Sequence, residues 1–139
     1  MSMNTIEQIK AHEGFRCHPY YCTEGALTIG YGFNLDSGGI SEEEADLILS
    51  MRIEGIRMRL ANAVPWYANM VPARQAVFIN MTYQMGFNGF KSFKRMLKHA
   101  QLCDYELAAK EMLNSLWAKQ TPERAAELAL QMKSGEWQS

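Results

Sequence analysis

The chain has 139 residues, of which 47% are hydrophobic and 21% are charged, and its formal net charge is −1. This length and composition are typical of one globular domain, with room for two lobes. A charge near zero argues against binding to nucleic acid or to an anionic membrane through bulk charge, and no apolar run is long enough to span a membrane. The first residues, Met-Ser-Met-Asn-Thr, have neither a basic n-region nor an apolar h-region, so we expect no signal peptide and no N-terminal anchor.

The N-terminal segment predicts a helix followed by a short β region. The helix is expected over residues 5–13, with Thr5 as its candidate N-cap, Gln8 completing a capping box, and Gly14 as its stop. Residues 15–34 are rich in the turn and strand residue types, which predicts short strands joined by tight turns. A glycine-rich loop is expected over residues 36–39.

Glu13 is placed where this helix meets the predicted hairpin. A carboxyl group at such a junction can be shielded from water, which favours the protonated form that a general acid needs. The alternative is a solvated glutamate next to an ordinary glycine cap.

The remainder of the chain has a helical pattern. Ser41 followed by three glutamates predicts a helix start with a capping box, and apolar residues recur at helical spacing through about residue 62. Pro65 is expected to end this long helix. Further helices are predicted, in chain order, over residues 72–85, 90–98, 104–117 and 122–132, with breaks at Gly86 and Gly89.

These elements predict an α+β fold in a single domain, because no linker or repeat divides the chain. We expect a small N-terminal lobe of about residues 13–41 and an inter-lobe helix of about residues 42–62. A helical C-terminal lobe of about residues 66–139 follows.

Cysteine and histidine form no metal or disulfide pattern. Cys17 and Cys22 are four residues apart without a Cys-x-x-Cys motif, and the three histidines lack the i, i+4 spacing of a zinc helix. Three cysteines in a chain of this length fit a protein made in a reducing compartment. We therefore predict no metal site.

Five segments, in the same order along the chain, resemble the phage-type lysozymes (endolysins) of glycoside hydrolase family 24, the T-even phage lysozyme group. They are Glu13-Gly14 with Thr28-Ile29-Gly30-Tyr31-Gly32, Ile40-Ser41 with its three glutamates, Asn80 through Gly86, Trp117 through Ala125, and Gly135-Glu136-Trp137. The resemblance implies a lysozyme-like fold in which the N-terminal helix belongs with the C-terminal lobe. It also implies hydrolysis of the β-1,4 bond between N-acetylmuramic acid and N-acetylglucosamine in peptidoglycan.

The same resemblance assigns catalytic roles to Glu13, Cys22 and Thr28. Glu13 matches the general acid, which protonates the leaving oxygen, and Thr28 matches a threonine that can hold the attacking water. Cys22 stands where the family often has an acidic residue, so its role as base, nucleophile or water positioner stays open, and so does the inverting outcome that the family implies. Glu24 and Asp36 are substitute carboxylates nearby. As structural alternatives, Thr28 is an ordinary strand residue and Cys22 a small buried hydrophobe.

Four more positions match family cleft residues. Asn34, Tyr83 and Gln84 correspond to substrate-binding positions, and Arg124 corresponds to an arginine that pairs with the catalytic acid. An aromatic ring and an amide suit the mixed surface of a glycan. The alternatives are a packed helix face for Tyr83 and Gln84 and a surface arginine for Arg124.

We therefore expect a monomeric peptidoglycan muramidase that needs no cofactor and acts as a phage or prophage endolysin. It would wait in the host cytoplasm until a holin-type pore released it to the periplasm and cell wall. The alternatives are a catalytically impaired peptidoglycan-binding or tail-associated module, a purely structural helical domain, and a lytic transglycosylase.

Overall fold

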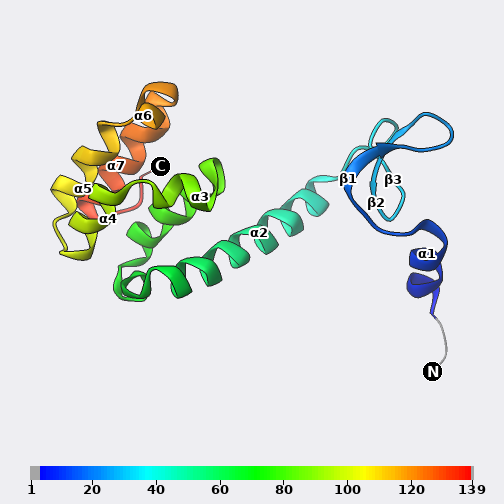
Figure 1. Ribbon diagram of the computed structural model, residues 1–139, viewed down its shortest axis with the longest axis horizontal. Helices are drawn as coiled ribbons and strands as arrows, with labels where there is room; N and C mark the ends of the chain where they lie inside the picture. The colour runs from blue at the N-terminus through cyan, green and yellow to red at the C-terminus, as the bar shows by residue number, and fades with distance from the viewer. Residues whose placement is uncertain (1–3, 139) are drawn as a thin grey trace. The chain divides into compact units, whose positions relative to one another are not determined.

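The computed structural model describes residues 4–138, and by internal contacts it divides into two compact units (Figure 1). The N-terminal unit extends to Ile48 and the C-terminal unit begins at Leu49. A three-stranded antiparallel sheet near the N-terminus is followed by helices, which confirms the predicted α+β class. Residues 1–3 and 139 of the predicted single domain lie outside the described residues.

The N-terminal unit begins with α1 (Thr5–Glu13), whose bounds are those predicted. Its predicted N-cap was wrong, because the side chain of Asn4 accepts a hydrogen bond from the Glu7 backbone N–H at 2.9 Å, and Thr5 is already helical. Asparagine is at least as good an N-cap as threonine, so the cap moves one residue earlier without moving the helix. Gly14 ends α1 with φ +70°, and its N–H donates to the Lys10 carbonyl.

The predicted β region forms three strands in the order β1-β2-β3: β1 (Arg16–Tyr21), β2 (Leu27–Gly30) and β3 (Phe33–Asn34). Tyr20 pairs with Thr28, and Thr28 pairs in turn with Asn34. Residues paired directly across antiparallel strands project from the same face of a sheet. The register therefore places Thr28 and Asn34 side by side.

Helix α2 (Glu42–Ala63) begins with the predicted capping box. The Ser41 hydroxyl accepts from the Glu44 N–H at 3.1 Å, and the Glu44 carboxylate accepts from the Ser41 N–H at 2.8 Å. The helix ends just before Pro65, as expected. Proline then opens a short 3-10 helix, η1 (Pro65–Asn69), which was not predicted because five residues carry too little periodicity.

Five helices complete the C-terminal unit: α3 (Pro72–Lys91), α4 (Lys94–Gln101), α5 (Tyr105–Leu113), α6 (Leu116–Gln120) and α7 (Pro122–Ser134). The predicted end of α3 at Gly86 is a kink, with φ +83° and ψ 164°, and the helix resumes through Gly89. The single helix predicted over 104–117 is two helices, because Ser115 caps α6 by accepting from the Ala118 N–H at 3.1 Å.

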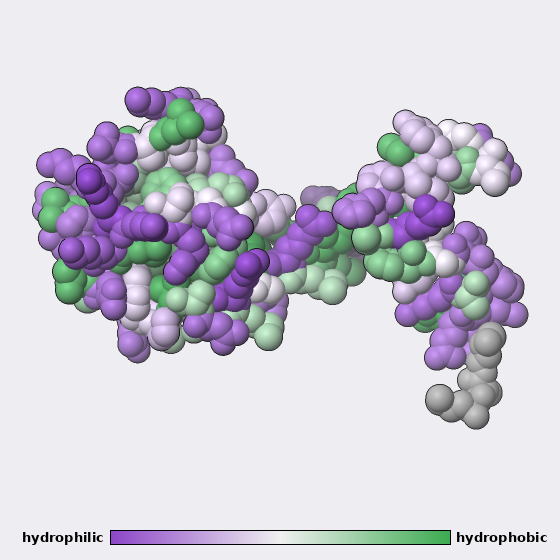
Figure 2. Space-filling model, viewed as in Figure 1, coloured by the Kyte–Doolittle hydropathy of each residue, from purple (hydrophilic) through white to green (hydrophobic). Residues whose placement is uncertain are grey.

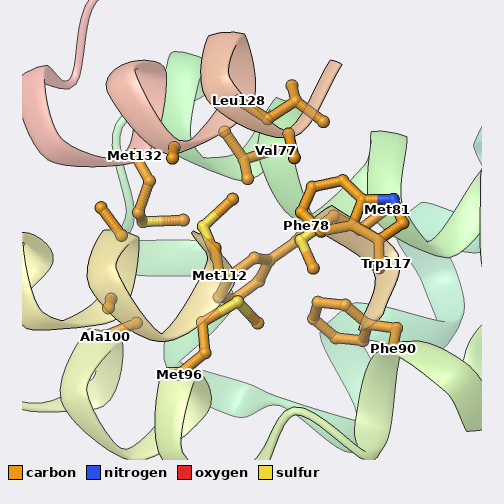
Figure 3. Close-up of a cluster of buried hydrophobic side chains, with 14 of the residues drawn as sticks. Val77, Phe78, Met81, Phe90, Met96, Ala100, Met112, Trp117, Leu128 and Met132 are labelled. Carbon is orange, nitrogen blue, oxygen red and sulfur yellow. The ribbon is translucent and has the colours of Figure 1, made fainter. Parts of the chain in front are cut away.

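The core of the C-terminal unit is formed by side chains from several of these helices (Figure 3). Methionine is prominent in it, and the flexible thioethers fill the gaps between aromatic rings. Phe78 and Phe90 lie edge to face at 4.9 Å between ring centroids, and both are fully buried. Figure 2 shows mostly hydrophilic residues over the visible surface of this unit. In the described part of the chain, no helix combines the length and apolarity needed to cross a membrane.

Candidate active site

The residues predicted for the site fall into two groups, one in each unit. Glu13, Cys22, Thr28 and Asn34 belong to the N-terminal unit, and Tyr83, Gln84 and Arg124 belong to the C-terminal unit.

Glu13 is the last residue of α1, and its carboxylate packs against Gly32 in the turn between β2 and β3. A Cβ atom at residue 32 would lie 2.8 Å from Glu13 Cδ and closer still to one carboxylate oxygen. Gly32 also has φ +75°, a conformation that favours glycine. Glu13 is exposed, and within residues 4–48 its carboxylate takes part in no hydrogen bond or ion pair. The turn therefore holds the carboxylate in place without occupying its oxygens.

Cys22 begins the turn that joins β1 to β2. Its N–H donates to the Ala26 carbonyl at 3.0 Å, and its carbonyl accepts from the Gly25 N–H at 2.9 Å. Hydrogen bonds from the backbone of Ala26 and then of Glu24 are the main causes that lower the pKa of the Cys22 thiol. Desolvation opposes them; a hydrogen bond from the Thr28 side chain lowers the pKa by less than desolvation raises it, and the Glu24 charge has the smallest effect, which raises it. The backbone of this turn thus favours the thiolate form of Cys22.

Thr28 is buried, with 4% of its surface exposed, and its hydroxyl donates to the Ala26 carbonyl at 2.8 Å. A hydroxyl has one proton and two acceptor lone pairs. While the Thr28 hydroxyl donates its hydrogen bond to the Ala26 carbonyl, its oxygen lone pairs can accept a hydrogen bond from the Cys22 thiol or from a water. When Cys22 is ionised, the same proton can turn to the sulfur. Cys22 and Thr28 are thus linked through Ala26, whose carbonyl accepts from both the Cys22 N–H and the Thr28 hydroxyl.

Asn34 and Asp36 organise the loop after β3. Asn34 Oδ1 accepts from the Ser37 N–H at 3.0 Å, which leaves its amide hydrogens as donors beside Thr28. Asp36 Oδ2 accepts from the Leu27 N–H at 2.7 Å and so ties this loop to the start of β2. That structural role was missed by sequence reasoning, which named Asp36 only as a substitute carboxylate.

In the C-terminal unit, Gln84 and Arg124 have hydrogen-bond partners that were not predicted. The Trp117 indole N–H donates to Gln84 Oε1 at 2.8 Å, so the amide nitrogen of Gln84 is the part left for a ligand. Arg124 donates from Nε and Nη2 to Asn80 Oδ1, at 2.9 and 2.6 Å. Trp117 and Asn80 both lie in segments already singled out, and Asn80 is one helical turn before Gln84. Their position in those segments is the signal that could have identified them.

Tyr83 and Arg124 also share a cavity of about 360 Å3, which Asn80 and Trp137 help to line. The Tyr83 residue is 49% exposed, so its side chain is not part of the buried core. A partly exposed ring next to a fixed guanidinium can bind a polar ligand that has one apolar face. Within residues 4–138, no group of three or more histidine, cysteine or acidic residues is arranged to hold a metal ion.

Comparison with known proteins matches the phage lysozyme family model to residues 10–132. The chain is 26% identical over 166 residues to the pre-baseplate central spike protein Gp5 of Enterobacteria phage T4, covering 99% of this chain and 29% of that protein. It is 39% identical over 69 residues to probable T4-type lysozyme 1 of Dictyostelium discoideum, covering 50% of this chain and 41% of that protein. An endolysin of Acyrthosiphon pisum secondary endosymbiont phage 1 is 30% identical over 116 residues, covering 80% of this chain and 75% of the relative. The chain thus spans less than half the length of the first two relatives.

Proposed function

The chain belongs to the phage lysozyme family, and from that premise we propose that it is a peptidoglycan muramidase. It would hydrolyse the β-1,4 bond between N-acetylmuramic acid and N-acetylglucosamine. The observation that carries this proposal is the Glu13 carboxylate, packed against Gly32 and left without a partner in its own unit. Glu13 is exposed and not shielded from water as expected, but both oxygens of its carboxyl group are unoccupied and so accessible to a glycosidic oxygen.

Glu13 would donate its proton to the glycosidic oxygen as the bond to the leaving sugar breaks. The sugar left behind carries positive charge, and a water must attack it from the other side. In our proposal the Thr28 hydroxyl accepts one hydrogen bond from that water, and Cys22 removes its proton as a thiolate or orients it as a thiol. Attack by a positioned water inverts the anomeric configuration, while a direct attack by Cys22 would retain it.

The C-terminal group would bind the glycan. We infer that Tyr83 packs against a sugar ring and that the free amide nitrogen of Gln84 donates to a polar substituent of the glycan. In the N-terminal unit, the free amide nitrogen of Asn34 would be a further donor to the glycan. Arg124 is held by Asn80 within the C-terminal unit. The role that we propose for it, pairing with the catalytic acid, comes from the family resemblance. These roles remain predictions.

The test is the clearing of outer-membrane-permeabilised Gram-negative cells by the wild type and by Glu13→Gln. We expect the substitution to slow clearing by about a hundredfold or more, the usual contribution of a general acid, while the circular dichroism spectrum is unchanged. Glu7→Gln, on the same helix and also exposed, serves as the matched control and should clear at the wild-type rate. If Glu13→Gln kept most of the activity, the acid would be misassigned.

The products distinguish two reactions that use one acid. Hydrolysis yields muramic acid reducing ends, whereas a lytic transglycosylase yields anhydro-muramic ends. Reducing-end analysis of digested wall should show the former. Anhydro ends would replace the muramidase proposal.

A second candidate is a wall-binding or tail-associated module with impaired catalysis. It is favoured by the match of 99% of this chain to part of a phage spike protein and by a cysteine at residue 22. A neutral thiol stabilises developing positive charge poorly compared with a carboxylate. Sedimentation with purified wall but no clearing would support this candidate.

As an endolysin, the protein would reach the wall from the host cytoplasm through a holin-type pore; similarity to a phage endolysin supports this route. Expression with and without a holin tests the route. We expect the protein in the periplasm only when the holin is present. Its appearance in the periplasm of holin-free cells would rule out this dependence.

A further inference from the structure

We propose that a cavity of about 300 Å3 in the C-terminal unit binds a phosphate monoester. The cavity is lined by residues from the end of α2, from η1, from the end of α3 and from α4. None of the residues proposed above for catalysis or for glycan binding lines it. Phosphate binding and hydrolysis would therefore use different side chains.

The segment that forms this cavity is cationic, although the whole chain is close to neutral. Residues 55–103 contain no aspartate or glutamate, so all 15 acidic residues of the chain lie outside this segment. The segment contains half of the 14 lysines and arginines, namely Arg57, Arg59, Arg74, Lys91, Lys94, Arg95 and Lys98. A net charge of −1 therefore leaves room for a local site that attracts anions.

Three of these lysines line the cavity: Lys91 from α3, and Lys94 and Lys98 from α4. No acidic residue lines it. Within residues 4–138, none of the three ammonium groups takes part in an ion pair or a hydrogen bond. Like charges around one cavity repel one another, and an anion bound between them would remove this repulsion.

The formation of α4 does not account for its lysines. Lys94 is the first residue of α4, which has no acidic residue in its first turn and no side-chain cap. Positive charge is unfavourable at the N-terminus of a helix, and like charges four residues apart, as in Lys94 and Lys98, repel each other. Lys91 differs, because it lies in the last turn of α3, where a cation is favourable. A bound anion would stabilise Lys94 where the helix itself does not.

The rest of the cavity wall is mostly apolar and includes one indole ring. Trp66 is half-buried and lies edge to face on the buried Phe78 ring, with 5.8 Å between the ring centroids. Its indole N–H can only donate a hydrogen bond, and it has no acceptor within residues 4–138. Val64 and Leu97 also line the cavity. The ligand expected here is thus an anion that accepts hydrogen bonds and carries an apolar part.

A phosphate monoester has this chemistry. It carries about two negative charges at pH 7 and three strong acceptor oxygens, which suit several ammonium groups and an indole N–H. Its carbon chain would lie against Val64 and Leu97. A single-stranded nucleic acid would need several aromatic rings for successive bases, and Trp66 is the one ring that lines the cavity. A soluble ester and the headgroup of phosphatidic acid share the chemistry that the cavity selects.

Binding of glycerol phosphate to the full chain, measured by NMR on nitrogen-labelled protein, tests the site. The Trp66 indole signal, assigned with Trp66→Phe, should shift on binding. We expect the double variant Lys94→Gln, Lys98→Gln to raise Kd by about tenfold, since each exposed ion pair contributes about threefold. The double variant Lys110→Gln, Lys119→Gln removes the same charge from exposed positions outside the cavity and should leave Kd unchanged. Absence of binding by the folded wild type, or equal Kd for the two double variants, would overturn the inference.

Two single variants separate the cavity from its surroundings. Ala63 is the exposed last residue of α2 and lines the cavity, so Ala63→Leu narrows the cavity without changing charge. It should raise Kd by about threefold. An unchanged Kd would mean that the ester binds outside the cavity, which would overturn the site. Glu13→Gln should bind glycerol phosphate as the wild type does, so that failure of the muramidase proposal would not affect this one.

Vesicle sedimentation distinguishes the two sources of the phosphate. Vesicles of phosphatidylcholine are compared with vesicles that also contain phosphatidic acid. Sedimentation that requires phosphatidic acid, and that the variant Lys94→Gln, Lys98→Gln loses, would assign the site to a lipid headgroup. Glycerol phosphate binding without sedimentation would assign it to a soluble ester. Sedimentation that depends neither on phosphatidic acid nor on these lysines would overturn the lipid source.

Discussion

The two units of the chain are stabilised in different ways. In the described part of the N-terminal unit Thr28 is the one buried residue, and the strands and loops are held by hydrogen bonds and turn glycines. The C-terminal unit buries a continuous hydrophobic core. Single backbone positions should therefore control the geometry of the proposed acid and thiol, whereas side-chain volume should control the stability of the helical unit.

The largest effect expected from this comparison is the loss of a core ring. Phe78 is fully buried, with Phe90 and Trp66 edge to face at 4.9 and 5.8 Å between centroids. Phe78→Ala should reduce the free energy of unfolding by about 3–5 kcal/mol, as measured by denaturation followed through tryptophan fluorescence. Tyr21→Ala removes a ring that is 73% exposed and should change it by less than about 0.5 kcal/mol. Equal losses for the two variants would contradict the difference between the units.

The next effect is on catalysis and comes from one methyl group. Gly32→Ala places a Cβ atom against the Glu13 carboxylate and should move it from its position, which lowers the clearing rate by about a hundredfold. Gly32 has no contact with the core of the C-terminal unit, so the free energy of unfolding measured by tryptophan fluorescence should change little. Gly39→Ala is the control, because Gly39 also has a positive φ of +57° but no atom within 4 Å of its Cβ position. A comparable loss of activity in Gly39→Ala would assign the effect to backbone strain instead.

The features that sequence predicted correctly are local ones. The bounds of α1 and the capping box of α2 depend on residues within one turn of each other, and such signals are visible in a single chain. The α3 kink at Gly86 was predicted as an end, because a glycine after a periodic segment has the same appearance in both cases. Beyond the kink, Phe90 is fully buried, and such a long-range contact is not visible in the local sequence.

The missed parts of the candidate site depend on contacts across the fold. The Trp117–Gln84 and Arg124–Asn80 hydrogen bonds join residues 33 and 44 positions apart, a separation that carries no local pattern. Gly32 was predicted as part of an active-site segment, but its need for glycine comes from the Glu13 carboxylate beside it. The roles of the seven predicted residues themselves remain predictions.

A smaller effect should distinguish a structural carboxylate from a catalytic one. Asp36 accepts from the Leu27 N–H, so Asp36→Ala should speed hydrogen exchange at Leu27 by about fivefold, equivalent to about 1 kcal/mol. Asp36→Asn keeps an acceptor oxygen and should retain near wild-type clearing. If Asp36 were instead the substitute for the missing carboxylate at residue 22, Asp36→Asn would lose activity as severely as Glu13→Gln.

The smallest effect concerns the ionisation of Cys22. Because backbone hydrogen bonds lower the pKa of its thiol, alkylation by iodoacetamide should reach half its maximal rate below the ordinary thiol value of about 8.5. The measurement uses a Cys17→Ser, Cys103→Ser background, so that one thiol reports. Thr28→Val removes the side-chain hydrogen bond and should raise the midpoint, and Thr28→Ser should restore it. A midpoint at or above the ordinary value would contradict the thiolate-stabilising turn.

The lowered pKa of Cys22 also makes the stability of the folded chain depend on pH. Since the pKa of Cys22 is lower in the folded chain than in the unfolded one, its stabilising contribution is fully present above the unfolded pKa and is lost as the pH falls through the folded pKa. The core of the C-terminal unit has no such dependence on this thiol. If clearing by the wild type rises with pH along the Cys22 alkylation curve, and clearing by Cys22→Ala does not, the thiolate is the base. If the two pH profiles have the same shape, Cys22 acts as a neutral group that orients the water held by Thr28.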